Sequence, residues 1–138
     1  MASLYERLGG LQAIDSVVAS FVARCAGDDR INRKFERSDV ARLEKMLVDQ
    51  VCEATDGPCT YTGRNMQETH AGMGVTAGEF DALVEDLVAT LDEFNVPNEE
   101  QGELLGLLAP MRDDIVEVES PETATPLPDT YQTAPALR

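Results

Sequence analysis

One imidazole is present in the 138-residue chain, that of His70, in the segment TGRNMQETHAGMGVT at 62–76. A lone histidine is most often a loop or capping residue, but the same side chain can also act as a base or bind a metal ion. Hydrolysis is not favoured, because there is no second histidine and no G-x-S-x-G motif of a nucleophilic serine. The chemistry that remains depends on which side chains surround His70.

Three cysteines, Cys25, Cys52 and Cys59, are the other candidates for metal or redox chemistry. No two of them form a C-x-x-C pair, and their spacing does not suit a zinc site that also uses His70. The C-x-x-C-H motif of thioether-linked haem is absent as well. An odd number of cysteines at these spacings argues against a disulfide framework. We therefore expect three reduced, mostly buried thiols.

Hydrophobic periodicity predicts that helices position these side chains. Ser3 and Glu6 form a capping box at the start of a short helix, which Gly9 and Gly10 end. The next helix ends near Gly27, and its apolar face consists of Ile14, Val17, Val18, Phe21, Val22 and Cys25. A third helix, from Ser38 or Asp39 to about Ala54, has the apolar stripe Val40, Leu43, Met46, Leu47, Val51 and Ala54.

The histidine itself falls in a glycine-rich segment, 55–75, in which we expect at most a short helix around 65–70. Thr76 and Glu79 then form a second capping box. The helix that it starts is the most regular of the chain, with apolar residues Phe80, Leu83, Val84, Leu87, Val88, Leu91 and Phe94. The last helix follows Pro97, and Pro110 should kink it. The chain is therefore predicted to be all-α.

Composition excludes several classes of partner. The 26 acidic and 11 basic residues give a net charge of −15, which repels nucleic acid and anionic membranes. No stretch has the length of a transmembrane helix and no signal peptide is recognisable, so a cytoplasmic location is expected. Residues 1–118 read as one domain. The acidic tail 119–138 contains four of the seven prolines and is predicted to be disordered.

One kind of site needs only a single imidazole. A neutral histidine suffices to hold haem iron, and the rest of such a pocket is apolar. The helices around His70 provide several aliphatic faces for that purpose. Periodicity alone does not decide the matter, because Phe80, Leu83, Val84 and Leu87 would be buried in any helical domain.

Four segments resemble the group I truncated haemoglobins, also called two-over-two globins. They are LYERLGG at 4–10, AIDSVVASFVAR at 13–24, DGPCTYTGRNMQETHAGMGVT at 56–76 and VPNEEQGELLGLLAPM at 96–111. The match covers about residues 3–116, and its Y-T-G, Met and His-x-G-x-G-[IV]-T pattern is highly specific. The resemblance implies a globin-like fold, a truncated two-over-two helical sandwich. It also implies non-covalent haem b, a diatomic ligand such as O₂, NO or CO, and a monomeric chain that a reductase could serve.

The resemblance also assigns roles within the pocket. His70 corresponds to the proximal ligand of the iron, and Phe35 to the residue that packs on the porphyrin face. Tyr61 and Arg64 lie where the family's loop passes the haem edge. By sequence position, the cations best placed for the haem propionates are Arg42, Lys45 and Arg64, and each could equally be a solvated surface charge. The proximal and rear pocket positions are Met66, Val75, Phe80, Leu83, Val84 and Leu87.

The distal side of the pocket departs from the family. Val22 stands where members commonly have a tyrosine, Leu47 where they have a glutamine, and Leu43 at the gate. Gln50 is the neutral hydrogen-bonding side chain left on that face. Because bound O₂ gains from nearby donors, the family's nitric oxide dioxygenation is in doubt here, and we leave enzyme activity open.

Met46 leaves two functions open. In cyanobacterial and algal relatives its position supplies an internal sixth ligand to the iron, and a thioether could do the same. The protein would then be a six-coordinate His70/Met46 electron carrier or redox sensor. Equally, Met46 could be pocket wall, since methionine readily fills apolar gaps. A third possibility is a haem-free interaction module with the same fold.

Overall fold

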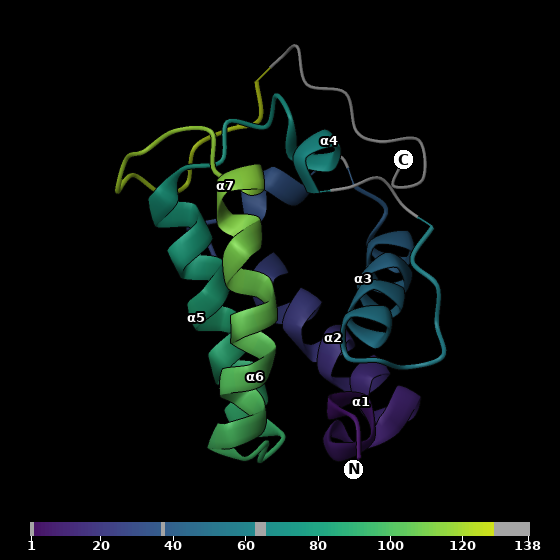
Figure 1. Ribbon diagram of the computed structural model, residues 1–138. Coiled ribbons are helices and arrows are strands. Elements are labelled where there is room, and N and C mark those ends of the chain that lie inside the picture. Colours follow the sequence, from purple (N-terminus) through teal and green to yellow (C-terminus); the bar gives the residue numbers. More distant parts are fainter. Residues whose placement is uncertain (1, 37, 63–65, 129–138) are drawn as a thin grey trace.

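The computed structural model describes residues 2–36, 38–62 and 66–128 (Figure 1). Within these ranges the regular elements are helical, and one isolated parallel bridge joins Thr76 to Val118. The elements are α1 (Leu4–Leu8), α2 (Gly10–Ala26), η1 (Asn32–Phe35), α3 (Val40–Ala54), α4 (Met66–His70), α5 (Ala77–Glu93), α6 (Asn98–Leu108), η2 (Ala109–Met111) and α7 (Arg112–Ile115).

The helices begin where the sequence predicts them, because the capping side chains bind free backbone amides. Ser3 Oγ accepts from the amide of Glu6 at 3.1 Å at the start of α1. Asp39 caps α3 by accepting from the amide of Arg42 at 3.3 Å. At α5 both halves of the capping box are present, with Thr76 and Glu79 each accepting from the other's backbone at 3.0 Å. These bonds satisfy amides that have no partner within the helix.

Pro110 does more than kink the last helix. The α-helical pattern stops at Leu108, a 3₁₀ turn contains the proline, and α7 starts at Arg112. Proline lacks the amide hydrogen that the ladder needs, and its ring crowds the preceding turn. The predicted single helix is therefore three short elements.

The helices form two pairs. Figure 1 shows α5 and α6 side by side and α3 on the other side of the molecule, with α2 running between them. One apolar cluster joins α1, α5 and α6 through Leu4, Leu87, Leu91 and Leu104. A second joins α2 to α3 through Ile14, Val18, Val22 and Val48. Since α2 also packs against α5, it connects the two pairs.

The prediction of three reduced thiols is wrong for two of the cysteines. Cys52, near the end of α3, forms a disulfide with Cys59, and their Cα atoms are 5.6 Å apart. The chain reverses just after α3, where Asp56 has a φ of 67° and the amide of Gly57 donates to the carbonyl of Cys52 at 2.7 Å. That reversal returns Cys59 to Cys52. Cys25 is free and buried, as predicted.

The first part of the predicted tail also differs from expectation. Residues 119–128 pack against the domain, and Leu127 is only 5% exposed in a cluster with Met73 and Val75. Composition missed this packing because polar bonds and one leucine provide the anchors. Residues 129–138 lie outside the described ranges. None of the described helices has the length and hydropathy needed to cross a membrane.

Candidate functional site

A cavity of about 650 Å³ lies between the two helix pairs. Its wall takes residues from α2, η1, α3, α4, α5 and α6, and most of them are aliphatic or aromatic. The volume falls within the range of pockets that bury small organic ligands and cofactors, about 300–1,000 Å³. A few polar side chains interrupt the apolar surface, and two of them, His70 and Gln50, come from opposite walls.

His70 is the last residue of α4 and lines the cavity. Its Nδ1 atom lies 2.9 Å from the carbonyl oxygen of Met66, one turn earlier in the same helix. Burial lowers the pKa of His70, so the ring is neutral at pH 7. A neutral imidazole that donates from Nδ1 carries its lone pair on Nε2. This bond therefore fixes both the tautomer and the ring orientation, as it does for metal-binding histidines in general.

The opposite wall is built by α2 and α3. Val22 is 5% exposed and belongs to the buried cluster that Leu43 and Leu47 flank. None of these three side chains carries a hydrogen-bond donor, so this part of the wall is apolar as the sequence predicts.

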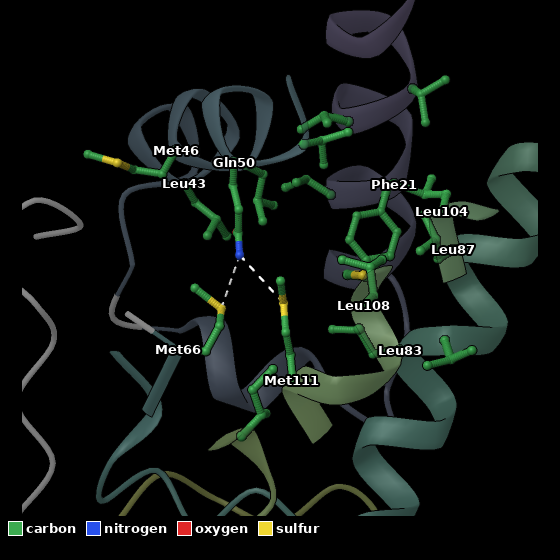
Figure 2. Close-up of a pocket in the computed structure, with 18 of the residues that line it drawn as sticks. Phe21, Leu43, Met46, Gln50, Met66, Leu83, Leu87, Leu104, Leu108 and Met111 are labelled. Atoms are coloured by element: carbon green, nitrogen blue, oxygen red, sulfur yellow. Dashed lines mark hydrogen bonds between the residues drawn. The ribbon is translucent and has the colours of Figure 1, made fainter. Parts of the chain in front are cut away.

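Gln50 is the polar exception on this wall. In Figure 2 its side chain points into the cavity toward Met66 and Met111. Its amide nitrogen is 3.3 Å from the sulfur of Met66 and 3.7 Å from that of Met111. Thioethers are weak acceptors, so these contacts leave the amide able to donate to a stronger partner.

Met46 lies at the edge of the same wall. It contributes to the cavity lining, but Figure 2 shows its side chain extending away from Gln50 and Met66. A bond from its sulfur to a metal at the centre of the cavity would need the side chain to turn inward.

Most other predicted pocket residues meet at this cavity. Those that line it are Phe35, Tyr61, Met66, Val75, Phe80, Leu83, Val84 and Leu87. Arg64 falls outside the described residues. The other predicted cations lie near carboxylates: Lys45 is 2.9 Å from Asp49, and Arg42 is 3.8 Å from Asp39.

Sequence reasoning missed two polar residues of the cavity wall and did not foresee the contact made by one apolar residue. Lys34 and Glu79 both line the cavity, are 4% and 2% exposed, and lie 3.6 Å apart as an ion pair. Glu79 was expected only as a helix cap, and a lysine in a short connector carries no sequence signal of burial. Met111 is the last residue of the segment 96–111, but its contact with Gln50 depends on the break at Pro110.

These residues fit an iron porphyrin. The cavity is apolar, it has the volume of a cofactor site, and its one neutral imidazole has a free metal-binding nitrogen. The described residues offer no cluster of three or more histidine, cysteine or acidic side chains for a different metal ion. The cavity residues therefore suit a metal ion that takes one imidazole from the protein and most of its other ligands from a cofactor.

Comparison with known proteins agrees with this site. The chain is 34% identical over 114 residues to the group 1 truncated haemoglobin GlbN of Mycolicibacterium paratuberculosis, a match that covers 83% of this chain and 84% of that protein. It is 39% identical over 103 residues to the corresponding protein of Synechocystis, covering 72% of this chain and 83% of the relative.

Solved structures give the same result. The Fe(III) truncated haemoglobin of Tetrahymena pyriformis superposes with a TM-score of 0.80 at 32% identity, covering 83% of this chain and 98% of that one. The 2/2 haemoglobin of Synechococcus sp. PCC 7002, in the cyanomet state with covalently attached haem, gives 0.79 at 35% identity over the same shares. These superpositions confirm the predicted all-α truncated-globin fold. The family model of bacterial-like globins matches residues 3–117, and the chain therefore belongs to that family, in which its relatives are group 1 truncated haemoglobins.

Proposed function

We propose that this globin holds haem b non-covalently through His70 and binds a diatomic ligand on the opposite face. The observation that carries the proposal is the position of His70, a neutral imidazole at the wall of a large apolar cavity, with Nδ1 engaged by the Met66 carbonyl. Membership of a haem-binding family supports the same conclusion. The haem supplies an iron atom at which O₂, NO or CO can bind.

The chain's own residues would set the preference among these ligands. Val22, Leu43 and Leu47 exclude water from the distal wall but donate no hydrogen bond. A donor to bound O₂ is worth about 1–3 kcal/mol, or roughly ten- to a hundredfold in affinity. CO depends less on such donors. We therefore propose weak O₂ binding, with nitric oxide dioxygenation disfavoured for the same reason.

Gln50 is the side chain in a position to raise the affinity for O₂. It comes from the same wall as Leu43 and Leu47, and among the described residues its amide nitrogen contacts the sulfurs of Met66 and Met111. Turning the amide away from weak acceptors costs little, so Gln50 could become the distal donor.

The six-coordinate alternative, with Met46 as the second axial ligand, has less support. The Met46 side chain extends away from the cavity interior, whereas Gln50 and Leu43 point into it (Figure 2). We therefore propose that His70 alone among the side chains would hold the iron, which would leave the iron able to bind the diatomic ligand.

A haem titration of the purified apoprotein tests the proposal. The expected result is a Soret band that saturates at one haem per chain, followed by a ferrous spectrum of the five-coordinate type that CO converts to six-coordinate. No saturable Soret band would leave a haem-free interaction module as the function. A six-coordinate ferrous spectrum before any CO is added would favour the internally ligated protein instead.

A further inference from the structure

The segment after the last helix lies almost wholly beyond the family match, which ends at residue 117. We name residues 117–128 the C-terminal strap (Figure 1, yellow). It begins as a short parallel pairing with the start of α5. The amides of Glu117 and Val118 donate to the carbonyl of Val75 at 2.9 and 3.1 Å, and the amide of Ala77 donates to the carbonyl of Val118 at 3.0 Å.

The far end of the strap is anchored in a buried polar cluster. Thr125 donates from its amide and its hydroxyl to Glu79 Oε2, at 2.9 and 2.8 Å. Lys34 Nζ donates to the Thr125 carbonyl at 3.0 Å and to the Pro126 carbonyl at 3.1 Å. Because Lys34 precedes Phe35 in η1, the strap ties the start of α5 to the element that carries the predicted porphyrin-stacking residue.

At its first residue the strap also contacts the backbone that follows His70. Glu117 Oε2 accepts from the amide of Gly72 at 3.0 Å, and its Oε1 accepts from the amide of Gly74 at 2.7 Å. Both glycines have positive φ, 83° and 69°, so this loop adopts a conformation that few other residues favour. The amide of Met73 donates in turn to the His70 carbonyl at 3.1 Å.

The Glu117 carboxylate thus accepts hydrogen bonds from two amides of the loop 71–74. The same loop is bonded to the proposed proximal histidine through the Met73 amide and the His70 carbonyl. Leu127 closes the loop from outside by packing with Met73 and Val75. Charge-assisted bonds to two amides restrict a glycine loop more than a neutral acceptor would. We propose that the C-terminal strap fixes the loop behind His70, and that Glu117 is the positioning residue through which it restrains the bond from His70 to haem iron.

This inference rests on the proposed function only for its effect on haem, because the restraint on residues 71–74 exists in the apoprotein as well. Three variants separate the parts of the strap. Glu117→Ala removes both acceptors, and Glu117→Gln keeps one acceptor oxygen. Gly78→Ala leaves Glu117 intact but inserts a Cβ against the Pro121 carbonyl and within 2.7 Å of the Glu122 carbonyl, which displaces the middle of the strap.

The chain offers matched controls. Glu119→Gln changes a strap carboxylate that pairs with Arg112 at 2.9 Å instead of with the loop. Gly102→Ala adds the same methyl group to a helical glycine at which a Cβ would meet nothing within 4 Å. All variants are first compared with the parent by circular dichroism.

The first measurement is amide hydrogen exchange in the apoprotein by NMR. We expect Gly72 and Gly74 to exchange at least about tenfold faster in Glu117→Ala, with only one of them affected in Glu117→Gln. The second measurement, on the haem complex, is the rate of haem transfer to an acceptor apoglobin and the iron–histidine stretching band of the ferrous form. Transfer should be several-fold faster in Glu117→Ala and Gly78→Ala, with a shifted band in Glu117→Ala and partial recovery in Glu117→Gln.

The outcomes are distinct. Unchanged exchange at Gly72 and Gly74 would overturn the strap's hold on the loop, whether or not haem binds. Changed exchange with an unchanged stretching band and transfer rate would overturn the positioning role. If the parent protein took up no haem, the proposed function would fail while the exchange result still decided the loop restraint.

Discussion

At the scale of single residues, the pocket is defined by how few polar groups it contains. His70 and Gln50 both line the cavity, with Nδ1 of His70 bonded to the Met66 carbonyl and the Gln50 amide bonded to methionine sulfurs, while Val22 and Leu47 bring no hydrogen-bond donor. Ligand preference should therefore respond strongly to adding or removing one donor.

Adding a donor at position 22 should stabilise bound O₂. In Val22→Tyr the phenol would approach the ligand from α2, and O₂ dissociation should slow by roughly tenfold or more, measured by stopped-flow displacement with CO. A slow dissociation in the parent protein would mean that Gln50 or water already supplies the hydrogen bond.

Replacing Gln50 tests whether its side-chain amide supplies a hydrogen bond to bound O₂. Gln50→Leu keeps the bulk but loses the donor, so O₂ dissociation should become faster by up to about tenfold if Gln50 donates, while CO association changes little. Gln67→Leu, at an exposed site of α4, is the control. Identical O₂ kinetics in parent and variant would show that Gln50 stays with the methionines.

Replacing Met46 by leucine tests whether this residue only lines the pocket or also binds the iron. Leucine preserves volume and apolarity, so packing should change little. Because the thioether points away from the cavity, we expect Met46→Leu to leave the ferrous spectrum and CO association unchanged. A shift from a six- to a five-coordinate spectrum, with faster CO association, would show that the sulfur binds iron in the parent.

A buried carboxylate outside the pocket gives the chain a pH dependence. Asp86 is 7% exposed, its Oδ2 has no hydrogen-bond partner among the described residues, and burial with the nearby Asp28 carboxylate raises its pKa to about 6. The folded state thus binds more protons than the unfolded chain between about pH 4 and 6, so this group's contribution to stability is lost as pH rises through that window.

Asp86→Asn removes the titrating proton. At pH 7 it should stabilise the fold by about 1 kcal/mol, and it should flatten the stability profile between pH 4 and 7 in urea unfolding. Asp113→Asn serves as the control, because its side chain is 95% exposed. A profile as steep in Asp86→Asn as in the parent would contradict the assignment.

At the scale of elements, the sequence predicted the features that depend on interactions between residues close together in the chain. The caps at Ser3, Asp39 and Thr76 and the apolar spacing of α2, α3 and α5 were all predictable, since each depends on residues a few positions apart. The disulfide was not, because it depends on the reversal at Asp56 and Gly57. The strap was not, because its side-chain anchors are 43 to 92 residues away along the chain.

The disulfide makes a quantitative prediction for the connection between α3 and α4. Unfolded without reductant, the chain should yield one titratable thiol, from Cys25, instead of three. Closing so short a loop is worth roughly 2–3 kcal/mol, so Cys59→Ser should lower the free energy of unfolding by about that amount. Three thiols in the unreduced protein would contradict the pairing.

At the scale of the whole molecule, two helix pairs enclose a cavity, and the strap packs against Met73 and Val75, which line it. Sequence motifs predicted a site at His70, because the pattern around this residue is specific, and His70 lines the cavity. They could not show which way Met46 points or that Lys34 is buried, since both depend on how the elements pack. A cofactor that fills the cavity between the pairs should stabilise the fold as a whole.

The central claim is that His70 binds the haem iron. The most direct measurement is haem retention by the variant His70→Gly with and without added imidazole. The variant should lose its Soret band on gel filtration, and added imidazole should restore it by supplying the missing ligand. Retention of haem with an unchanged spectrum in His70→Gly would contradict the claim, since the described cavity offers no other imidazole to the iron.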